Sequence, residues 1–137
     1  MPFQNPPDET IRAVLATPRT VAVVGCSPNP ERDSHRIAKL LQARGHRVIP
    51  VNPGYREILG QTCYASVRDI PEPVDMVDIF RRSEHVAAIV EEAIEAGAKI
   101  VWMQLGVIDD RAAAKAQDAG LTVVMDRCPA IEYRRLF

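Results

Sequence analysis

The residues best suited to chemistry follow the first apolar run, Thr20–Val24, where the chain turns at Gly25 before a helical segment begins. A glycine lets backbone N–H groups approach a phosphate closely, and the positive end of the following helix points at the same place. Arg32 can hold a phosphate through two hydrogen bonds, and Ser27 or Ser34 can add a hydroxyl. We therefore predict an anion-binding loop; a plain strand-to-helix turn with a solvated arginine is the alternative.

This loop differs from the dinucleotide-binding fingerprint Gly-x-Gly-x-x-Gly, because Ser27 and Pro30 stand in place of its second and third glycines. Dinucleotide enzymes also place an acidic residue at the end of the second strand to bind a ribose hydroxyl, whereas here Val51 is followed by Asn52 and Pro53. Asn52 can form hydrogen bonds without carrying charge, and Pro53 offers a flat surface to an adenine; an ordinary turn is the alternative. A nucleotide fits this pattern, and NAD fits it poorly.

Further polar and aromatic side chains follow the other expected strands. Tyr55 can stack on a base or cover the edge of the sheet. Arg81 and Arg82 end the third strand and face the same crevice as Arg32, so we expect one of the two to reach a phosphate. The side-chain amide of Gln104 has donors and acceptors that suit the amide groups of an extended ligand.

Residues able to catalyse a reaction are few. Cys26 has no histidine fixed beside it by sequence, and Cys128 stands apart from any evident acid or base. Near a helix N-terminus the Cys26 thiol can have a lowered pKa, but a buried, inert thiol at the strand end is the favoured interpretation. His35, in the first turn of a helix, is predicted to be exposed rather than catalytic. Because the three cysteines and three histidines are widely spaced, the sequence predicts no disulfide, metal site or catalytic residue.

The elements that position these residues alternate along the chain. Five β-branched apolar runs are typical of buried strands, and the segments between them have helical patterns of apolar residues. We expect the helix after the first strand to be capped by Asp33 or Ser34, and residues 52–73 to form one long irregular connection. The expected strands are residues 21–25, 47–51, 74–80, 99–103 and 121–126, and the other expected helices are residues 11–16, 83–96 and 109–119.

This alternation predicts an α/β fold. With right-handed crossovers it gives a Rossmann-like, doubly wound parallel sheet of five strands in the order 3-2-1-4-5, with helices on both faces. Ligands bind such sheets outside the carboxyl ends of the strands, where the winding direction reverses. We expect that reversal between the first and fourth strands, where it brings together residues 25–33, 51–55, 80–82 and 104–107.

Length and composition indicate a single domain of residues 1–137, in which residues 1–19 form an N-terminal helical extension. Apolar residues make up 47% and charged residues 26% of the chain, which is typical of a soluble globular protein. The net charge of −1 argues against a nucleic-acid partner. No apolar run approaches the roughly 20 residues that cross a bilayer. We therefore expect a cytoplasmic protein with neither a nucleic-acid nor a membrane partner.

Several motifs together resemble those of the small single-domain CoA-binding proteins, which are similar to the N-terminal CoA-binding domain of the succinyl-CoA synthetase alpha subunit. The resemblance extends over residues 20–137. It rests on Val-Ala-Val-Val-Gly-Cys-Ser-Pro-Asn-Pro-Glu-Arg-Asp-Ser (21–34), Val-Ile-Pro-Val-Asn-Pro-Gly-Tyr (48–55), Leu-Gly (59–60), Tyr-Ala-Ser-Val (64–67), Val-Asp-Met-Val-Asp-Ile-Phe (74–80), Gly-Ala-Lys-Ile-Val-Trp-Met-Gln (97–104) and Arg-Cys (127–128).

The resemblance implies a Rossmann-like fold with coenzyme A as its ligand. In the synthetase, catalysis depends on a phosphorylated histidine in a further domain, and none of the three histidines here matches that motif, so binding is implied and the reaction is not. The phosphate-bearing nucleotide would lie near the first loop and the adenosine against the second. The predicted ligand-binding residues are Gly25, Cys26, Ser27, Arg32, Ser34, Val51, Asn52, Pro53, Tyr55, Phe80, Arg81 and Gln104.

The charge pattern agrees with this ligand. CoA carries a 3′-phosphate on its ribose, which an acidic residue at the end of the second strand would repel and nearby arginines would attract. We therefore expect non-catalytic binding of coenzyme A or an acyl-CoA at the carboxyl ends of the parallel strands, and leave open a protein partner or a homo-oligomer. The alternatives are an NAD(P)-dependent oxidoreductase, a CoA-dependent acyl transferase that uses Cys26, and an interaction protein with an empty crevice.

Overall fold

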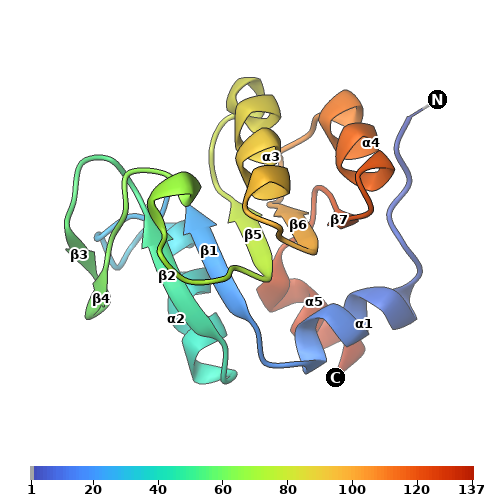
Figure 1. The fold of residues 1–137 in the computed structure, drawn as a ribbon. Helices are drawn as coiled ribbons and strands as arrows, with labels where there is room; N and C mark the ends of the chain where they lie inside the picture. Colours follow the sequence, from blue (N-terminus) through green and yellow to red (C-terminus); the bar gives the residue numbers. More distant parts are fainter. Residues whose placement is uncertain (1) are drawn as a thin grey trace.

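The computed structural model describes residues 2–137 and contains a parallel sheet of five strands with helices on both faces (Figure 1). Strands β3 and β4 form a separate antiparallel pair. The strands are β1 (Thr20–Val24), β2 (Arg47–Val51), β3 (Glu57–Ile58), β4 (Gln61–Thr62), β5 (Met76–Ile79), β6 (Ile100–Met103) and β7 (Thr122–Val124). The helices are α1 (Asp8–Ala16), α2 (Asp33–Ala43), α3 (Val86–Glu95), α4 (Asp110–Asp118) and α5 (Pro129–Leu136), with 3₁₀ turns η1 (Val67–Asp69) and η2 (Ser83–His85).

Side chains of each strand alternate between two apolar layers. Val21 and Val23 of β1 lie in the layer formed with α1, α2 and α5, whereas Ala22 and Val24 lie in the layer formed with α3 and α4. The fully buried Trp102 of β6 belongs to the first layer. Because both faces of the sheet are covered, the strands are continuous apolar runs rather than runs that alternate with polar residues.

The predicted α/β class and the five parallel strands are confirmed, but the third strand lies elsewhere than in the predicted order 3-2-1-4-5. The observed order β2-β1-β5-β6-β7 places this strand, β5, between β1 and β6. The connection 52–73 contains no α-helix, so the sequence has no apolar helix face that indicates on which side of the sheet this connection crosses. In the structure its Val67 packs in the layer of α3 and α4. A right-handed crossover on that side carries the chain over β1. The winding direction therefore reverses between β1 and β5.

Two local predictions also need correction. The N-cap of α2 is Arg32 rather than Asp33 or Ser34, because the Ser34 hydroxyl accepts the N–H of Ser27 at 2.9 Å instead of capping its own helix. Helix α5 was not predicted, since it is short and carries charged side chains on much of its surface. It packs against α1 and α2 and provides one wall of the site described below.

The buried His46, just before β2, connects this strand to α1 and α5 through hydrogen bonds. The Nδ1 atom of His46 accepts the N–H of Arg19 at 3.1 Å, and its Nε2 lies 2.9 Å from the Tyr133 hydroxyl. Tyr133 donates in turn to the Leu15 carbonyl at 3.2 Å. Since Nδ1 is an acceptor, the ring is neutral and Nε2 carries the proton that it donates to Tyr133. Burial lowers the pKa of His46, in agreement with a neutral ring.

We expect His46 to make the protein less stable in mild acid. As the pH falls below about 6.5, the unfolded chain binds a proton that the folded His46 excludes, so the free energy of unfolding decreases. Between about pH 7.5 and pH 5.5, the free energy of unfolding should therefore decrease less in His46→Gln than in the wild type. His85→Gln, at an exposed position, should show the same decrease as the wild type. Urea-unfolding midpoints at both pH values provide the measurement. An unchanged pH dependence in His46→Gln would contradict the assignment.

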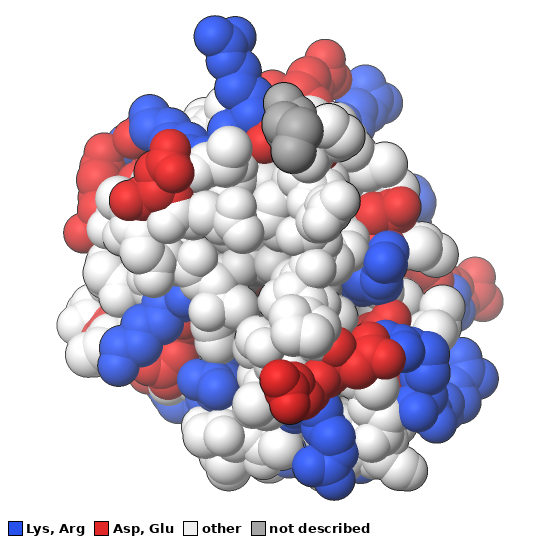
Figure 2. Space-filling view, turned by 90° about the vertical axis from the view of Figure 1, so that its right-hand side faces the viewer, with Lys and Arg blue, Asp and Glu red and all other residues white. Residues whose placement is uncertain are grey.

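The N-terminal segment is fixed along the β7 side of the molecule. The Asn5 side chain donates to the Met125 carbonyl at 2.8 Å and accepts the Met125 N–H at 2.7 Å. Figure 2 shows the face on this side, where an uncharged central area is bordered by basic and acidic side chains of mixed sign. Among the described residues, 2–137, no helix has the length and apolar character needed to cross a membrane.

Candidate functional site

A cleft of about 540 Å³ opens at the carboxyl ends of β1 and β5, where the winding of the sheet reverses. Such reversals are the usual ligand sites of open parallel sheets. Most of its lining side chains are polar or charged and come from the β1–α2 loop and the first turns of α2, so we call it the polar cleft. Its lining residues are Gly25, Ser27, Glu31, Arg32, Asp33, Ser34, Arg36 and Phe80.

Gly25 allows the ends of β1 and β5 to approach each other. Its φ is +87°, and its N–H donates to the Val51 carbonyl of β2 at 2.8 Å. A Cβ at this position would lie 3.1 Å from the Phe80 carbonyl oxygen and 3.1 Å from the Cδ of Arg81. Only glycine combines this backbone angle with such close packing, so the turn predicted from the sequence has a clear steric cause.

The loop after Gly25 is held by its own hydrogen bonds. The Ser34 hydroxyl accepts the Ser27 N–H at 2.9 Å, and the Ser27 carbonyl lies 2.9 Å from Nδ1 of His35. His35 is therefore buried against the loop, and the prediction that it is exposed was wrong. Within residues 2–137, the backbone N–H groups of Asp33 and Ser34 in the first turn of α2 have no acceptor. These two donors lie at the N-terminal end of α2, and the N-terminal end of a helix is the end that stabilises anions.

A second cleft, of about 400 Å³, adjoins the first between α2, the end of β6 and the start of α5. The two share Asp33, Arg36 and Phe80. Most of the other lining residues are apolar, so we call it the apolar cleft. They are Ile37, Leu40, Gln104, Leu105, Val107, Cys128 and Ala130. Together the clefts form one groove that is polar at the β1 end and apolar at the α5 end.

A buried polar pair lies beneath the apolar cleft. Nε2 of Gln104 donates to Oδ1 of Asp78 at 2.6 Å, while Oδ2 of Asp78 has no hydrogen-bond partner in the described structure. Burial raises the pKa of the Asp78 carboxyl to about 7, and the hydrogen bond from Gln104 offsets only part of this effect. A buried carboxyl with a raised pKa beside a cleft is a common feature of functional sites.

Cys26 lies under the loop, fully buried, and its side chain lines neither cleft. Burial raises the pKa of its thiol to about 12, and the nearby Cys63 and Asp78 act in the same direction. The thiol is therefore protonated at neutral pH and is a poor nucleophile. This geometry matches the inert thiol that the sequence favoured.

Two other predicted regions lie outside the groove. Both side-chain atoms of Asn52 are engaged within the protein, since Nδ2 donates to the Cys26 carbonyl and Oδ1 accepts the Gly54 N–H, each at 3.0 Å. Pro53 and Tyr55 are exposed in the same loop. The remaining pair, Val51 and Arg81, lines a separate cleft of about 190 Å³ on the α3 side of the sheet.

Sequence reasoning missed the contributions of α2 and α5 to the groove. Arg36 follows Arg32 by one helical turn, a spacing that places both on one face of α2. Leu40 is partly buried against the layer formed with α1, α2 and α5, and it also lines the apolar cleft. Cys128 and Ala130 enter the groove through α5, which was not predicted as a helix.

The fold is that of a Rossmann-like α/β protein with a cleft at the reversal of its sheet. Residues 19–134 match the model of the CoA binding domain, and the chain belongs to this family. It is 39% identical over 126 residues to the uncharacterized protein YneT of Bacillus subtilis. This match covers 92% of this chain and 93% of that protein.

Other similar proteins include one of known structure and one much longer enzyme. A hypothetical protein from Pyrococcus horikoshii OT3 has a solved structure with a TM-score of 0.93 and 43% identity, covering 99% of this chain and 96% of that chain. An ADP-forming acetate–CoA ligase of Archaeoglobus fulgidus is 35% identical over 124 residues. That match spans 83% of this chain and 18% of the ligase, so this chain corresponds to a small part of that enzyme.

Proposed function

We propose that this chain binds coenzyme A or an acyl-CoA, without transforming it, in the groove formed by the polar and apolar clefts. The observation that carries the proposal is the continuity of the two clefts through Asp33, Arg36 and Phe80. CoA has the same order of parts, because a phosphorylated adenosine and a pyrophosphate are followed by a long, less polar pantetheine arm. Membership of the CoA-binding domain family supports the same ligand.

The polar cleft has suitable donors for the phosphates. The N–H groups of Asp33 and Ser34 point out of the first turn of α2 without acceptors in the described chain. Arg36 is paired with Asp33 at 2.6 Å, but the exposed guanidinium of Arg32 forms no ion pair within residues 2–137. A guanidinium and helix N-terminal amides are the groups that proteins commonly use for phosphate.

The enzymatic alternatives have less support. The acyl transferase requires a reactive thiol at Cys26, whose burial raises its pKa to about 12. The oxidoreductase would use the loop after β2 for a ribose, but the Asn52 amide is already engaged. The similar acetate–CoA ligases are far longer than this chain, so ligand binding is the property we carry over from them.

Calorimetry with CoA and with dephospho-CoA tests the proposal. We expect Arg32→Ala to weaken CoA binding by about 1.5–3 kcal/mol, or roughly 10- to 100-fold, because a charged hydrogen bond to phosphate is lost. Dephospho-CoA should lose less if Arg32 contacts the 3′-phosphate. Arg111→Ala, on α4 at the opposite face, is the matched control and should bind both ligands normally.

Failure of wild-type protein to bind either ligand would overturn the proposed function. An equal loss for both ligands in Arg32→Ala would instead place this side chain at the pyrophosphate, which the two molecules share. An unchanged affinity for both would remove Arg32 from the site.

A further inference from the structure

Cys128 lines the apolar cleft at the edge of the layer formed with α1, α2 and α5. It is partly buried, in contrast to the buried Cys26 and Cys63. It occupies the N-cap of α5, but its side chain forms no capping hydrogen bond. Pro129 follows it and lacks an N–H. The thiol therefore lines the cleft without any hydrogen-bonding role in the helix.

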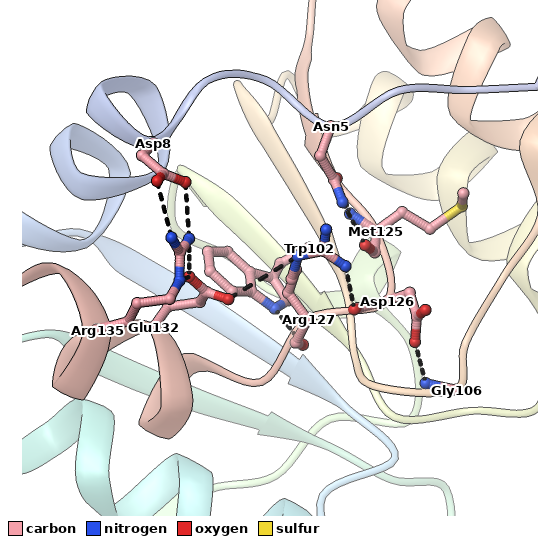
Figure 3. Close-up of polar contacts among 9 residues, drawn as sticks. All are labelled: Asn5, Asp8, Trp102, Gly106, Met125, Asp126, Arg127, Glu132 and Arg135. Atoms are coloured by element: carbon pink, nitrogen blue, oxygen red, sulfur yellow. Dashed lines mark hydrogen bonds and ion pairs between the residues drawn. The ribbon is translucent and has the colours of Figure 1, made fainter.

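Asp126 and Arg127, which directly precede Cys128, are held from several sides (Figure 3). The indole Nε1–H of Trp102 donates to the Arg127 carbonyl at 2.9 Å, and the Arg127 N–H donates to the Met103 carbonyl at 3.3 Å. Asp126, at a φ of +58°, accepts the Gly106 N–H at 2.7 Å. A non-glycine residue in this region is uncommon and is kept there by its surroundings. The position of Cys128 is thus fixed before any ligand arrives.

Gln104 independently indicates a ligand in the same cleft. Only 4% of this residue is exposed, and its Nε2 is taken by Asp78. Its carbonyl oxygen Oε1 forms no hydrogen bond in the described chain, although the residue lines the cleft. An amide oxygen without a protein partner, on a residue that is almost wholly buried, suits an incoming N–H donor. The pantetheine arm of CoA has two amide N–H groups before its terminal thiol.

The dimensions of the groove match that arm. From β1 to β7 the sheet crosses three strand spacings, each about 4.8 Å, or roughly 14 Å in all. The arm from the pyrophosphate to the sulfur has about thirteen bonds and extends roughly 15 Å, at the ~1.2 Å per bond of an extended chain. A ligand with its phosphates at the β1–α2 loop can therefore place its thiol beside the start of α5.

We propose that Cys128 forms a mixed disulfide with the thiol end of a CoA ligand bound in the groove, an inference that rests on the proposed function. The reaction is a thiol–disulfide exchange with CoA disulfide. The deprotonated sulfur of Cys128 attacks one sulfur of the CoA disulfide, a new S–S bond forms, and the old S–S bond breaks. The leaving CoA thiolate takes up the proton released by Cys128. The disulfide reagent is thus the oxidant, and one free CoA is released for each protein modified.

Intact-protein mass spectrometry after incubation with CoA disulfide tests the proposal. We expect one adduct, with the mass of CoA less two hydrogen atoms, that maps to Cys128 and is removed by dithiothreitol. Cys128→Ser should form none, while the matched control Cys63→Ser should still form it. Cystamine, a small disulfide without a nucleotide, should react at least about tenfold more slowly, because it lacks the groove contacts that hold the reacting sulfur in place.

The outcomes separate this proposal from the proposed function. Calorimetry of the wild-type protein with reduced CoA under reducing conditions reports binding alone. Binding of CoA without an adduct at Cys128 would overturn the mixed disulfide and leave the proposed function intact. An adduct that forms equally fast with cystamine, or that maps to Cys63, would also overturn it. Absence of CoA binding would overturn both.

Discussion

Asp78→Asn is expected to stabilise the protein at alkaline pH. Asp78 lies in the middle of the sheet, paired in register with Val23 of β1 and Trp102 of β6, and has no exposed surface. Burial raises its pKa from 3.8 to about 7. The folded chain therefore keeps a proton that the unfolded chain releases. Its stability falls as the pH rises from about 4 to about 7, and this contribution is constant at higher pH.

The size of the effect follows from this difference in pKa. At about pH 8, the ionised Asp78 costs on the order of 4 kcal/mol relative to a neutral group. Asparagine is neutral and can still accept from Gln104, but its amide nitrogen replaces Oδ2, which has no partner. An unpaired buried donor costs about 1–3 kcal/mol. We therefore expect the variant to gain roughly 1–3 kcal/mol at about pH 8, and no advantage near pH 4.

Urea unfolding of the wild type and the variant across this pH range measures the gain. Asp75→Asn is the matched control, because it removes a carboxylate just before β5 that accepts the Thr20 N–H at 2.9 Å. That control should not become more stable at alkaline pH. A constant difference between Asp78→Asn and the wild type from about pH 4 to pH 8 would mean that Asp78 has no raised pKa.

The unfavourable burial of Asp78 has a structural consequence at the groove. Its carboxylate holds Nε2 of Gln104 inside the protein, so Oε1 is left for the apolar cleft. A residue that lowers stability while it orients a cleft side chain is expected at a binding site rather than in a purely structural core. We infer that Asp78 positions Gln104 for a ligand.

Local sequence patterns predicted the strands and the glycine turn well. The β-branched run that ends at Gly25 must turn at this residue, since position 25 requires a positive φ and tolerates no Cβ. The position of β5 could not be obtained in this way, because it depends on which face the connection 52–73 crosses. That face is decided by the packing of Val67 and its neighbours, which are distant in sequence.

The candidate site was predictable where it lies on the first loop and at the ends of β5 and β6, since the predicted Phe80 and Gln104 also line the clefts. Ser27 and Arg32 follow directly from the strand-to-helix pattern, and both line the polar cleft. The apolar cleft depends on how α2 and α5 meet, and sequence periodicity does not report contacts between helices. Cys128 was for this reason interpreted as an isolated thiol, although it shares a cleft with Gln104.

Gly25→Ala is expected to destabilise the protein and abolish ligand binding. An L-residue at a φ of +87° costs about 1–2 kcal/mol, and the added Cβ would be 3.1 Å from the Phe80 carbonyl oxygen, which belongs to the backbone and cannot move freely. Overpacking adds about 1–3 kcal/mol, so we expect a loss of roughly 2–5 kcal/mol in the free energy of unfolding. The turn must also shift away from β5, which moves the N–H groups that face the polar cleft.

Gly120→Ala separates the strain of the backbone from the close packing at Gly25. Its φ is +93°, but nothing lies within 4 Å of an added Cβ. This control should lose only the backbone part, about 1–2 kcal/mol, and bind CoA as the wild type does. Urea unfolding gives the two stabilities, and calorimetry below the unfolding transition gives the affinities. Equal losses of stability in the two variants, or normal CoA binding by Gly25→Ala, would show that the contact between Gly25 and the end of β5 does not shape the site.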